Sequence, residues 1–284
     1  MHTYHEKDVV DVLKSEGPLT GRELESKLGV PYEQRMVVTN LWALCTLSQQ
    51  IHLQKISNRY LRIDRQTGDL YLSPSVPREF SDFTVVGLDL SGVAEKAERM
   101  KEHYKEVGDD KRHAAKAVVT NAMATLQHPN AQQYFCFLLG GDLVYGMASD
   151  AQREAVNGEI VQGSDIDIII LHSEIVNSGL IGLLDNALLA QKLRLGRPPY
   201  REEMDYKLKG FEAVEEQSAM DSPIKVIACK ILVESEFLYG NVELHQRAIG
   251  LLKQMGVLQK LKEMKEIASV NREEYERRLL AQFS

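Results

Sequence analysis

Two aspartates at the start of an apolar segment are the residues in this sequence best suited to chemistry. Asp165 and Asp167 are separated by one residue and introduce Ile166–Leu171, whose β-branched composition is typical of a buried strand. Because strand side chains alternate between faces, both carboxylates point to the same face, with Cα atoms about 6.5 Å apart. Such carboxylates repel each other, and a divalent cation relieves that repulsion. Since Mg²⁺ prefers hard oxygen ligands, the spacing predicts a magnesium site.

A double glycine lies upstream, directly after another apolar segment. Tyr134–Leu139 is followed by Gly140 and Gly141, and the residues after them predict the start of a short helix. Glycine lets the backbone approach a ligand closely, and the N-terminus of a helix offers N–H groups to phosphate. A phosphate site beside a metal site implies a nucleotide.

Together these features resemble the DNA polymerase beta-like nucleotidyltransferase superfamily, over roughly the C-terminal half of the chain. The signature of that superfamily is an apolar residue, Gly, then Gly or Ser, with Asp-x-Asp in a later apolar strand. The segments Leu139–Gly141 and Asp165–Asp167 match it, and Ser164 precedes the first Asp as is common there. Because the gap between the two motifs is longer than usual, we interpret Asp150–Gln162 as a loop inserted after the short helix.

The resemblance also implies a third carboxylate on a later strand, in the pattern apolar-Asp-apolar. The segment Met204–Tyr206 fits this pattern, so Asp205 is the expected third ligand. Glu203 is the nearest competitor, because strand alternation places its side chain on the same face. In such a family Asp165, Asp167 and Asp205 would hold two Mg²⁺ or Mn²⁺ ions, and Asp205 would accept the proton of an acceptor hydroxyl.

The implied activity is transfer of a nucleoside monophosphate from an NTP, with ATP as first choice, to an acceptor hydroxyl, with release of pyrophosphate. Gly140 and Gly141 would hold the β- and γ-phosphates, and Ser164 would contribute to the same site. Lys230 lies in an expected helix, Ile224–Val233. Its side chain would either bind a phosphate of the nucleotide or be an ordinary exposed charge. The acceptor stays open between a protein, an RNA, a small molecule and a second nucleotide. The alternative is a nucleotide-sensing, DNA-binding regulator that uses this fold without turnover.

Residues 1–80 have the pattern of a winged helix-turn-helix-like module. Helices are expected near His5–Ser15, after a capping box that begins at Thr20, and near Pro31–Ser48. A β-hairpin is expected from Ile51 to Leu72. Such a module binds DNA through its third helix and touches phosphates with the hairpin.

DNA contact through this module is one of two roles that the sequence leaves open. Four basic side chains favour it: Arg35, Arg59, Arg62 and Arg65. Glu33 at the start of the third helix opposes DNA contact, because a carboxylate there would face the phosphate backbone. The competing role is protein docking or dimerisation, so a homo-oligomer stays open.

The remaining chain is expected to contain a connector and the catalytic domain. Residues 81–130 predict two helices, about Val93–Val107 and Lys111–Gln127, and residues 131–284 predict a nucleotidyltransferase domain that ends in helices. The expected fold class is therefore α+β, with a mixed sheet flanked by helices and preceded by the winged-helix module and the helical connector.

Composition and charge narrow the classes of partner. Most of the net charge of −7 lies in residues 131–284, where 23 acidic side chains face 17 basic ones. That balance opposes a grip on long nucleic acids. The three cysteines stand apart among apolar neighbours, so neither a disulfide framework nor a zinc site is expected. Apolar segments are far shorter than the roughly 20 residues that cross a bilayer, so we expect a cytoplasmic protein without a membrane partner.

Overall fold

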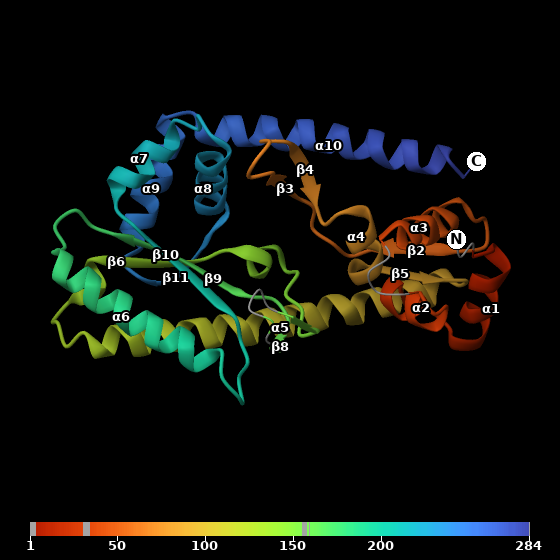
Figure 1. Ribbon diagram of the computed structural model, residues 1–284, viewed down its shortest axis with the longest axis horizontal. Coiled ribbons are helices and arrows are strands. Elements are labelled where there is room, and N and C mark those ends of the chain that lie inside the picture. The colour runs from red at the N-terminus through yellow and green to blue at the C-terminus, as the bar shows by residue number, and fades with distance from the viewer. Residues whose placement is uncertain (1–3, 31–34, 155–157, 159, 284) are drawn as a thin grey trace. The chain divides into compact units, whose positions relative to one another are not determined.

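The structure, a computed structural model, is mixed α+β and divides into two compact units (Figure 1). It describes residues 4–30, 35–154, 158 and 160–283. Unit 1 comprises residues 1–62, 70–103 and 264–284, and unit 2 comprises residues 63–69 and 104–263. Two long helices, α5 (Leu90–Thr125) and α10 (Val257–Ala281), contribute residues to both units.

Unit 1 combines short helices with a three-stranded sheet and a separate hairpin. Its helices, besides parts of α5 and α10, are α1 (Glu6–Glu16), α2 (Gly21–Lys27), α3 (Arg35–Leu47) and α4 (Val76–Phe83). Its strands are β1 (Leu19–Thr20), β2 (His52–Lys55), β3 (Tyr60–Ile63), β4 (Leu70–Ser73) and β5 (Thr84–Gly87). The sheet has the order β1-β5-β2 with antiparallel neighbours, and β3 pairs with β4.

Local signals in unit 1 are confirmed where they act within a few residues. The Oγ1 of Thr20 accepts the N–H of Glu23 at 3.1 Å, and the Glu23 carboxylate accepts the N–H of Thr20 at 2.7 Å, so the predicted capping box begins α2. The hairpin predicted from Ile51 to Leu72 is only partly right. Strands β3 and β4 form the hairpin, whereas β2 pairs with β5. Because β5 follows α4 in the sequence, the residues around β2 do not indicate this pairing.

A buried ion cluster ties the C-terminal residues of α10 into unit 1. Glu79 of α4 is 2% exposed, and its carboxylate accepts hydrogen bonds from Nε of Arg59 at 2.8 Å and Nη2 of Arg272 at 3.1 Å. Arg272 is 6% exposed and also donates to the carbonyl of Pro74 at 2.7 Å. Because buried charges are stable only when paired, these contacts fix α10 against α4.

Unit 2 is built around a four-stranded mixed sheet. Its strands are β6 (Phe135–Leu139), β7 (Gln152–Glu154), β8 (Ile160–Gln162), β9 (Ile166–His172), β10 (Met204–Lys209) and β11 (Glu236–Gly240). Its helices, besides parts of α5 and α10, are the 3₁₀ helices η1 (Ala131–Gln133) and η2 (Gly141–Tyr145) and the α-helices α6 (Ser178–Leu195), α7 (Phe211–Ser218), α8 (Pro223–Glu234) and α9 (Val242–Gln254). The sheet order is β10-β9-β6-β11, with β10 parallel to β9 and the other two pairs antiparallel.

Helices cover both faces of this sheet, as the continuous apolar composition of its strands predicts. Ile166, Ile168 and Ile170 of β9 are buried in one core with side chains of α5 and α6, while α7, α8 and α9 cover the other face (Figure 1). Ile169 lies on that second face and is also buried. The strand is buried between its ends: Asp167 and the preceding Asp165 are partly exposed at its N-terminal end, and His172 is partly exposed at its C-terminal end. The strand therefore presents its carboxylates at one end of the sheet.

Two predicted elements of unit 2 differ from the observed ones. The connector, expected as two helices, is the single helix α5. Gly108 lies within this helix and is buried, and a Cβ added there would lie 3.8 Å from the Cβ of Ala148. A glycine inside a helix costs about 1 kcal/mol, which tertiary packing overrides. The insertion Asp150–Gln162, expected as a loop, contains the antiparallel strands β7 and β8.

The two units also divide the chain differently from the expected domains 1–80, 81–130 and 131–284. Helix α4 and strand β5 complete the sheet and the core of unit 1, and residues 264–284 join it through the ion cluster. Among the described residues, no helix combines the length and the apolar composition that a bilayer crossing requires.

Candidate active site

The register of two parallel strands brings the predicted carboxylates together. Asp205 of β10 lies directly opposite Asp167 of β9, so their Cα atoms are neighbours across the ladder, about 4.8 Å apart. One position earlier, the N–H of Ile166 donates to the carbonyl of Glu203 at 2.9 Å, which places Glu203 beside Asp165. Four acidic side chains therefore meet at one end of the β9–β10 pair.

Asp167 is the member of this acid cluster that burial and charge perturb most. Burial raises the pKa of Asp167 to about 7, and the negative charges of Asp165, Asp205, Asp142 and Glu203 contribute to the increase. A carboxyl group responds to its neighbours in this way only when their charges face it at short range. The predicted acids therefore converge on Asp167, and Asp142 of η2 joins them, a residue to which the sequence analysis gave no role.

The double glycine bends directly against Asp167. The N–H of Gly140 donates to the carbonyl of Asp167 at 3.0 Å, and Gly141 has a φ of +69°. A Cβ at Gly141 would overlap with Oδ2 of Asp167, so only glycine fits this position. The helix that follows is the 3₁₀ helix η2, and the N–H of Gly140 is already bonded within the sheet. Gly141 therefore lets the bend pack directly against the Asp167 carboxylate.

Two cations hold members of the acid cluster, and neither was expected from the sequence. Lys192 of α6 forms an ion pair with Asp205, whose side chain is 60% exposed. Arg153 of β7 places Nη2 at 2.7 Å from Oε2 of Glu203 and at 3.7 Å from Oδ1 of Asp165. Both cations reach the cluster from outside the β9–β10 pair, so no motif in the sequence announces them.

Ser164 has a structural environment beside this cluster. It is buried, its Oγ accepts the N–H of Ser149 at 3.0 Å, and its own N–H donates to the carbonyl of Ser149 at 2.8 Å. These bonds fix the chain immediately before Asp165. The predicted contact of Ser164 with a nucleotide stays a prediction.

Lys230 of α8 is buried and bound to neighbouring side chains. It forms an ion pair with Glu234 of the same helix, and its Nζ donates to the hydroxyl of Tyr145 at 2.7 Å. Tyr145 ends η2, the element that Gly141 begins. Lys225, in contrast, forms ion pairs with the exposed side chains of Glu216 of α7 and Asp221, which precedes α8. Lys230 is therefore linked to the glycine bend, whereas Lys225 is a surface charge.

The donor chemistry of the cluster fits a hard divalent ion such as Mg²⁺. Carboxylate oxygens are suitable ligands, and the partly buried Asp167 faces several negative charges that a bound cation would neutralise. Among the described residues no three His, Cys, Asp or Glu side chains are already gathered as a metal site. Because Arg153 and Lys192 hold two of the acids, those side chains would have to leave their partners in order to share an ion.

The basic residues proposed for DNA contact in unit 1 have different surroundings. Arg59 is bound to Glu79 and Glu276 in the ion cluster, which makes it a structural residue. Arg62 and Arg65 are exposed at and beyond the end of β3. Glu33 and the side chain of Arg35 lie outside the described part of the chain.

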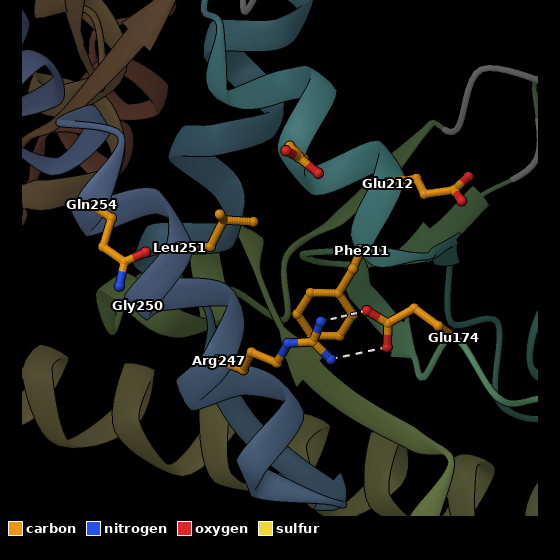
Figure 2. A pocket seen from close by; sticks show the side chains of 8 residues that line it. Glu174, Phe211, Glu212, Arg247, Gly250, Leu251 and Gln254 are labelled. Carbon is orange, nitrogen blue, oxygen red and sulfur yellow. Dashed lines mark hydrogen bonds and ion pairs between the residues drawn. The ribbon is translucent and has the colours of Figure 1, made fainter.

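A separate hollow lies at the opposite end of β9 from the acid cluster. It has a volume of about 430 Å³ and is lined by Glu174, Phe211, Arg247 and residues of α7 and α9 (Figure 2). Arg247 donates to Glu174 at 2.9 Å and stacks on the ring of Phe211, with 4.1 Å between its Cζ and the ring centroid. The hydrogen bonds from Arg247 hold the pKa of the Glu174 carboxyl below its usual value. The hollow is therefore lined by an ion pair of its own and stands apart from the acid cluster.

Comparison of the chain with protein-family models, with curated proteins and with solved structures finds no match.

Proposed function

We propose that the protein is a metal-dependent nucleotidyltransferase that moves a nucleoside monophosphate from an NTP to an acceptor hydroxyl and releases pyrophosphate. The observation that carries this proposal is the pairing of Asp167 with Asp205 on adjacent parallel strands, with Asp165 on the same face and the glycine bend against Asp167. In the same proposal, unit 2 has a nucleotidyltransferase fold and unit 1 is a winged-helix module.

Each carboxylate has a distinct role in the proposed reaction. Asp165 and Asp167 would hold the ion that carries the triphosphate, and Asp205 would share a second ion with Asp167. When bound, Mg²⁺ would supply positive charge to the attacking and leaving oxygens. The exposed Asp205 is the group placed to take the proton of the acceptor hydroxyl, because its side chain opens to solvent, where an acceptor would approach.

The glycine bend and α8 would act on the phosphate chain. Gly141 has no Cβ to collide with Oδ2 of Asp167, so the backbone of the bend lies directly against this carboxylate, where the phosphate chain would bind. Lys230 is connected through Tyr145 to the end of η2, which makes it a positioning residue for the bend in the nucleotide-free protein. If Lys230 leaves Glu234 when a nucleotide binds, its ammonium group can reach phosphate directly.

Incubation with Mg²⁺, a cell extract and each α-labelled NTP tests this function. We expect label in a product, identified by mass spectrometry, together with release of pyrophosphate. Asp167→Asn and Asp205→Asn are expected to lower the rate about a hundredfold or more, because each removes charge that the transition state requires. Glu174→Gln, at the far end of β9, is the matched control and is expected to keep the rate.

Two outcomes would refute the transferase. Pyrophosphate release that Asp167→Asn leaves unchanged would remove the acid cluster from the chemistry. Binding of an NTP by the wild-type protein, without pyrophosphate release or labelled product under any of these conditions, would favour the nucleotide-sensing alternative.

A further inference from the structure

The insertion that carries β7 and β8 is anchored beside the acid cluster by several contacts. The N–H of Gln162, the last residue of β8, donates to the carbonyl of Arg201 at 2.8 Å. Lys111 of α5 is buried, donates from Nζ to the carbonyl of Gln162 at 2.9 Å, and pairs with Glu202. The β7–β8 hairpin is therefore fixed to the chain that leads into β10.

From this hairpin, Arg153 reaches back to the carboxylates. Its Nε donates to the carbonyl of Gly163 at 2.6 Å, and its Nη2 lies at 2.7 Å from Glu203 and at 3.7 Å from Asp165. The bond to Gly163 holds the guanidinium at the mouth of the cluster, where its positive charge faces two carboxylates. A guanidinium in this place neutralises the charge that a divalent ion would otherwise neutralise.

We propose that Arg153, which pairs with Glu203, is an autoinhibitory residue that competes with the divalent ion for Asp165. This inference rests on the proposed function and deepens it, because it assigns a regulatory role to the inserted hairpin. In the metal-free protein the guanidinium occupies the mouth of the site, and Asp165 becomes a ligand only after Arg153 withdraws. A segment or ligand that pulls the β7–β8 hairpin away would therefore increase metal affinity.

Titration of the nucleotide-free protein with Mn²⁺ alone, followed by the electron paramagnetic resonance signal of free Mn²⁺, tests the inference. We expect Arg153→Gln to bind Mn²⁺ about tenfold more tightly than wild type, because a competing positive charge has been removed. Arg153→Lys keeps the charge and is expected to stay close to wild type. Arg247→Gln is the matched control, since it removes the same charge from another ion pair of unit 2 and is expected to leave the affinity unchanged.

The outcomes separate this inference from the function on which it rests. If Mn²⁺ binds the wild-type protein and Asp167→Asn abolishes that binding, the metal site stands. An unchanged or weaker affinity of Arg153→Gln then overturns the autoinhibitory role alone. If neither protein binds Mn²⁺ in a way that depends on Asp167, both the metal site and the inference are overturned. Circular dichroism verifies that both Arg153 variants are folded, so that the difference in affinity between them reports the loss of the positive charge.

Discussion

Neutralising Asp167 is expected to stabilise the metal-free protein, although it removes a proposed catalytic group. Burial raises the pKa of Asp167 from 3.8 to about 7, with further contributions from the surrounding acids. An acid with a raised pKa binds its proton more tightly in the folded state than in the unfolded state. The free energy of unfolding of the wild-type protein therefore falls as pH rises from about 4 to about 7, and stays lowered above that range.

The size of the effect follows from the shift. About three pKa units at about 1.4 kcal/mol each set a ceiling of about 4 kcal/mol. Solvent at the partly exposed end of β9 screens part of the repulsion, so we expect Asp167→Asn to raise the free energy of unfolding by about 1–3 kcal/mol at pH 8.5. The gain is expected to shrink as pH falls and to approach zero below about pH 4, where the wild-type carboxyl becomes protonated in both states.

Urea unfolding of wild type and Asp167→Asn at pH 4.5, 6.5 and 8.5, in EDTA, measures this difference. Glu174→Gln serves as the control, because its carboxyl has a lowered pKa and its loss cannot stabilise the protein at high pH. A difference between wild type and Asp167→Asn that does not grow with pH would contradict the convergence of the acids on Asp167. The same result would remove the physical basis of the proposed metal site.

Three further predictions concern the same site and unit 1. At pH 8, Mg²⁺ is expected to raise the urea midpoint of wild type but not of Asp167→Asn, because an ion that binds only the folded state stabilises it and the variant lacks the site. Equal responses of the two proteins would contradict the metal site. Gly141→Ala is expected to lower the free energy of unfolding by about 1–3 kcal/mol and to remove most of the activity, because the new Cβ meets Asp167 and the residue has a positive φ. Gly182→Ala, in open space on α6, is the control and is expected to stabilise the protein slightly in the same urea assay. Burial alone would raise the pKa of Glu79, but the hydrogen bond from Arg59 and the charge of Lys55 outweigh burial and lower the pKa to about 2. The ionised Glu79 therefore stabilises the fold above about pH 4, and this contribution is lost as pH falls toward 2. Glu79→Gln is therefore expected to lower the free energy of unfolding by about 3 kcal/mol at pH 7, since it removes one of the two carboxylates that pair with the buried Arg272 and leaves only Glu276. A loss that does not shrink with acid would contradict this account.

Much of the acid cluster could be predicted from the sequence because its geometry follows from strand periodicity. Alternation along β9 places Asp165 and Asp167 on one face, and a strand composed of Ile166–Leu171 can only be buried beyond them. The positions of the main helices followed from local periodicity and capping, as at Thr20. The position of Asp205 opposite Asp167 needed the family resemblance, since its own strand carries no sign of its register.

Pairings between distant segments were the part that the sequence could not provide. The sequence predicts β2 as part of the first arm of a hairpin whose second arm is β4, but the partner of β2 is β5, which follows α4 in the sequence. The break predicted near Gly108 failed for a related reason, since a contact with Ala148 holds the helix where its local propensity is weakest. The helix propensities of different residues differ by about 1 kcal/mol, and the free energy gained by burying a side chain in a core exceeds that difference.

The cations around the carboxylates are also contacts between distant segments of the chain. They distinguish the geometry of the acids from the cations that pair with them. Strand register fixes which acids face one another, so substitutions outside β9 and β10 leave that geometry in place. The cations that pair with these acids in the metal-free protein, Arg153 and Lys192, come from a hairpin and a helix outside the ladder. Changes in the β7–β8 hairpin can therefore alter metal affinity while the proposed catalytic acids stay where they are. A deletion that replaces Gln152–Gln162 by a short glycine linker is expected to bind Mn²⁺ at least as tightly as Arg153→Gln, and weaker binding would show that the hairpin supports the site instead of restraining it.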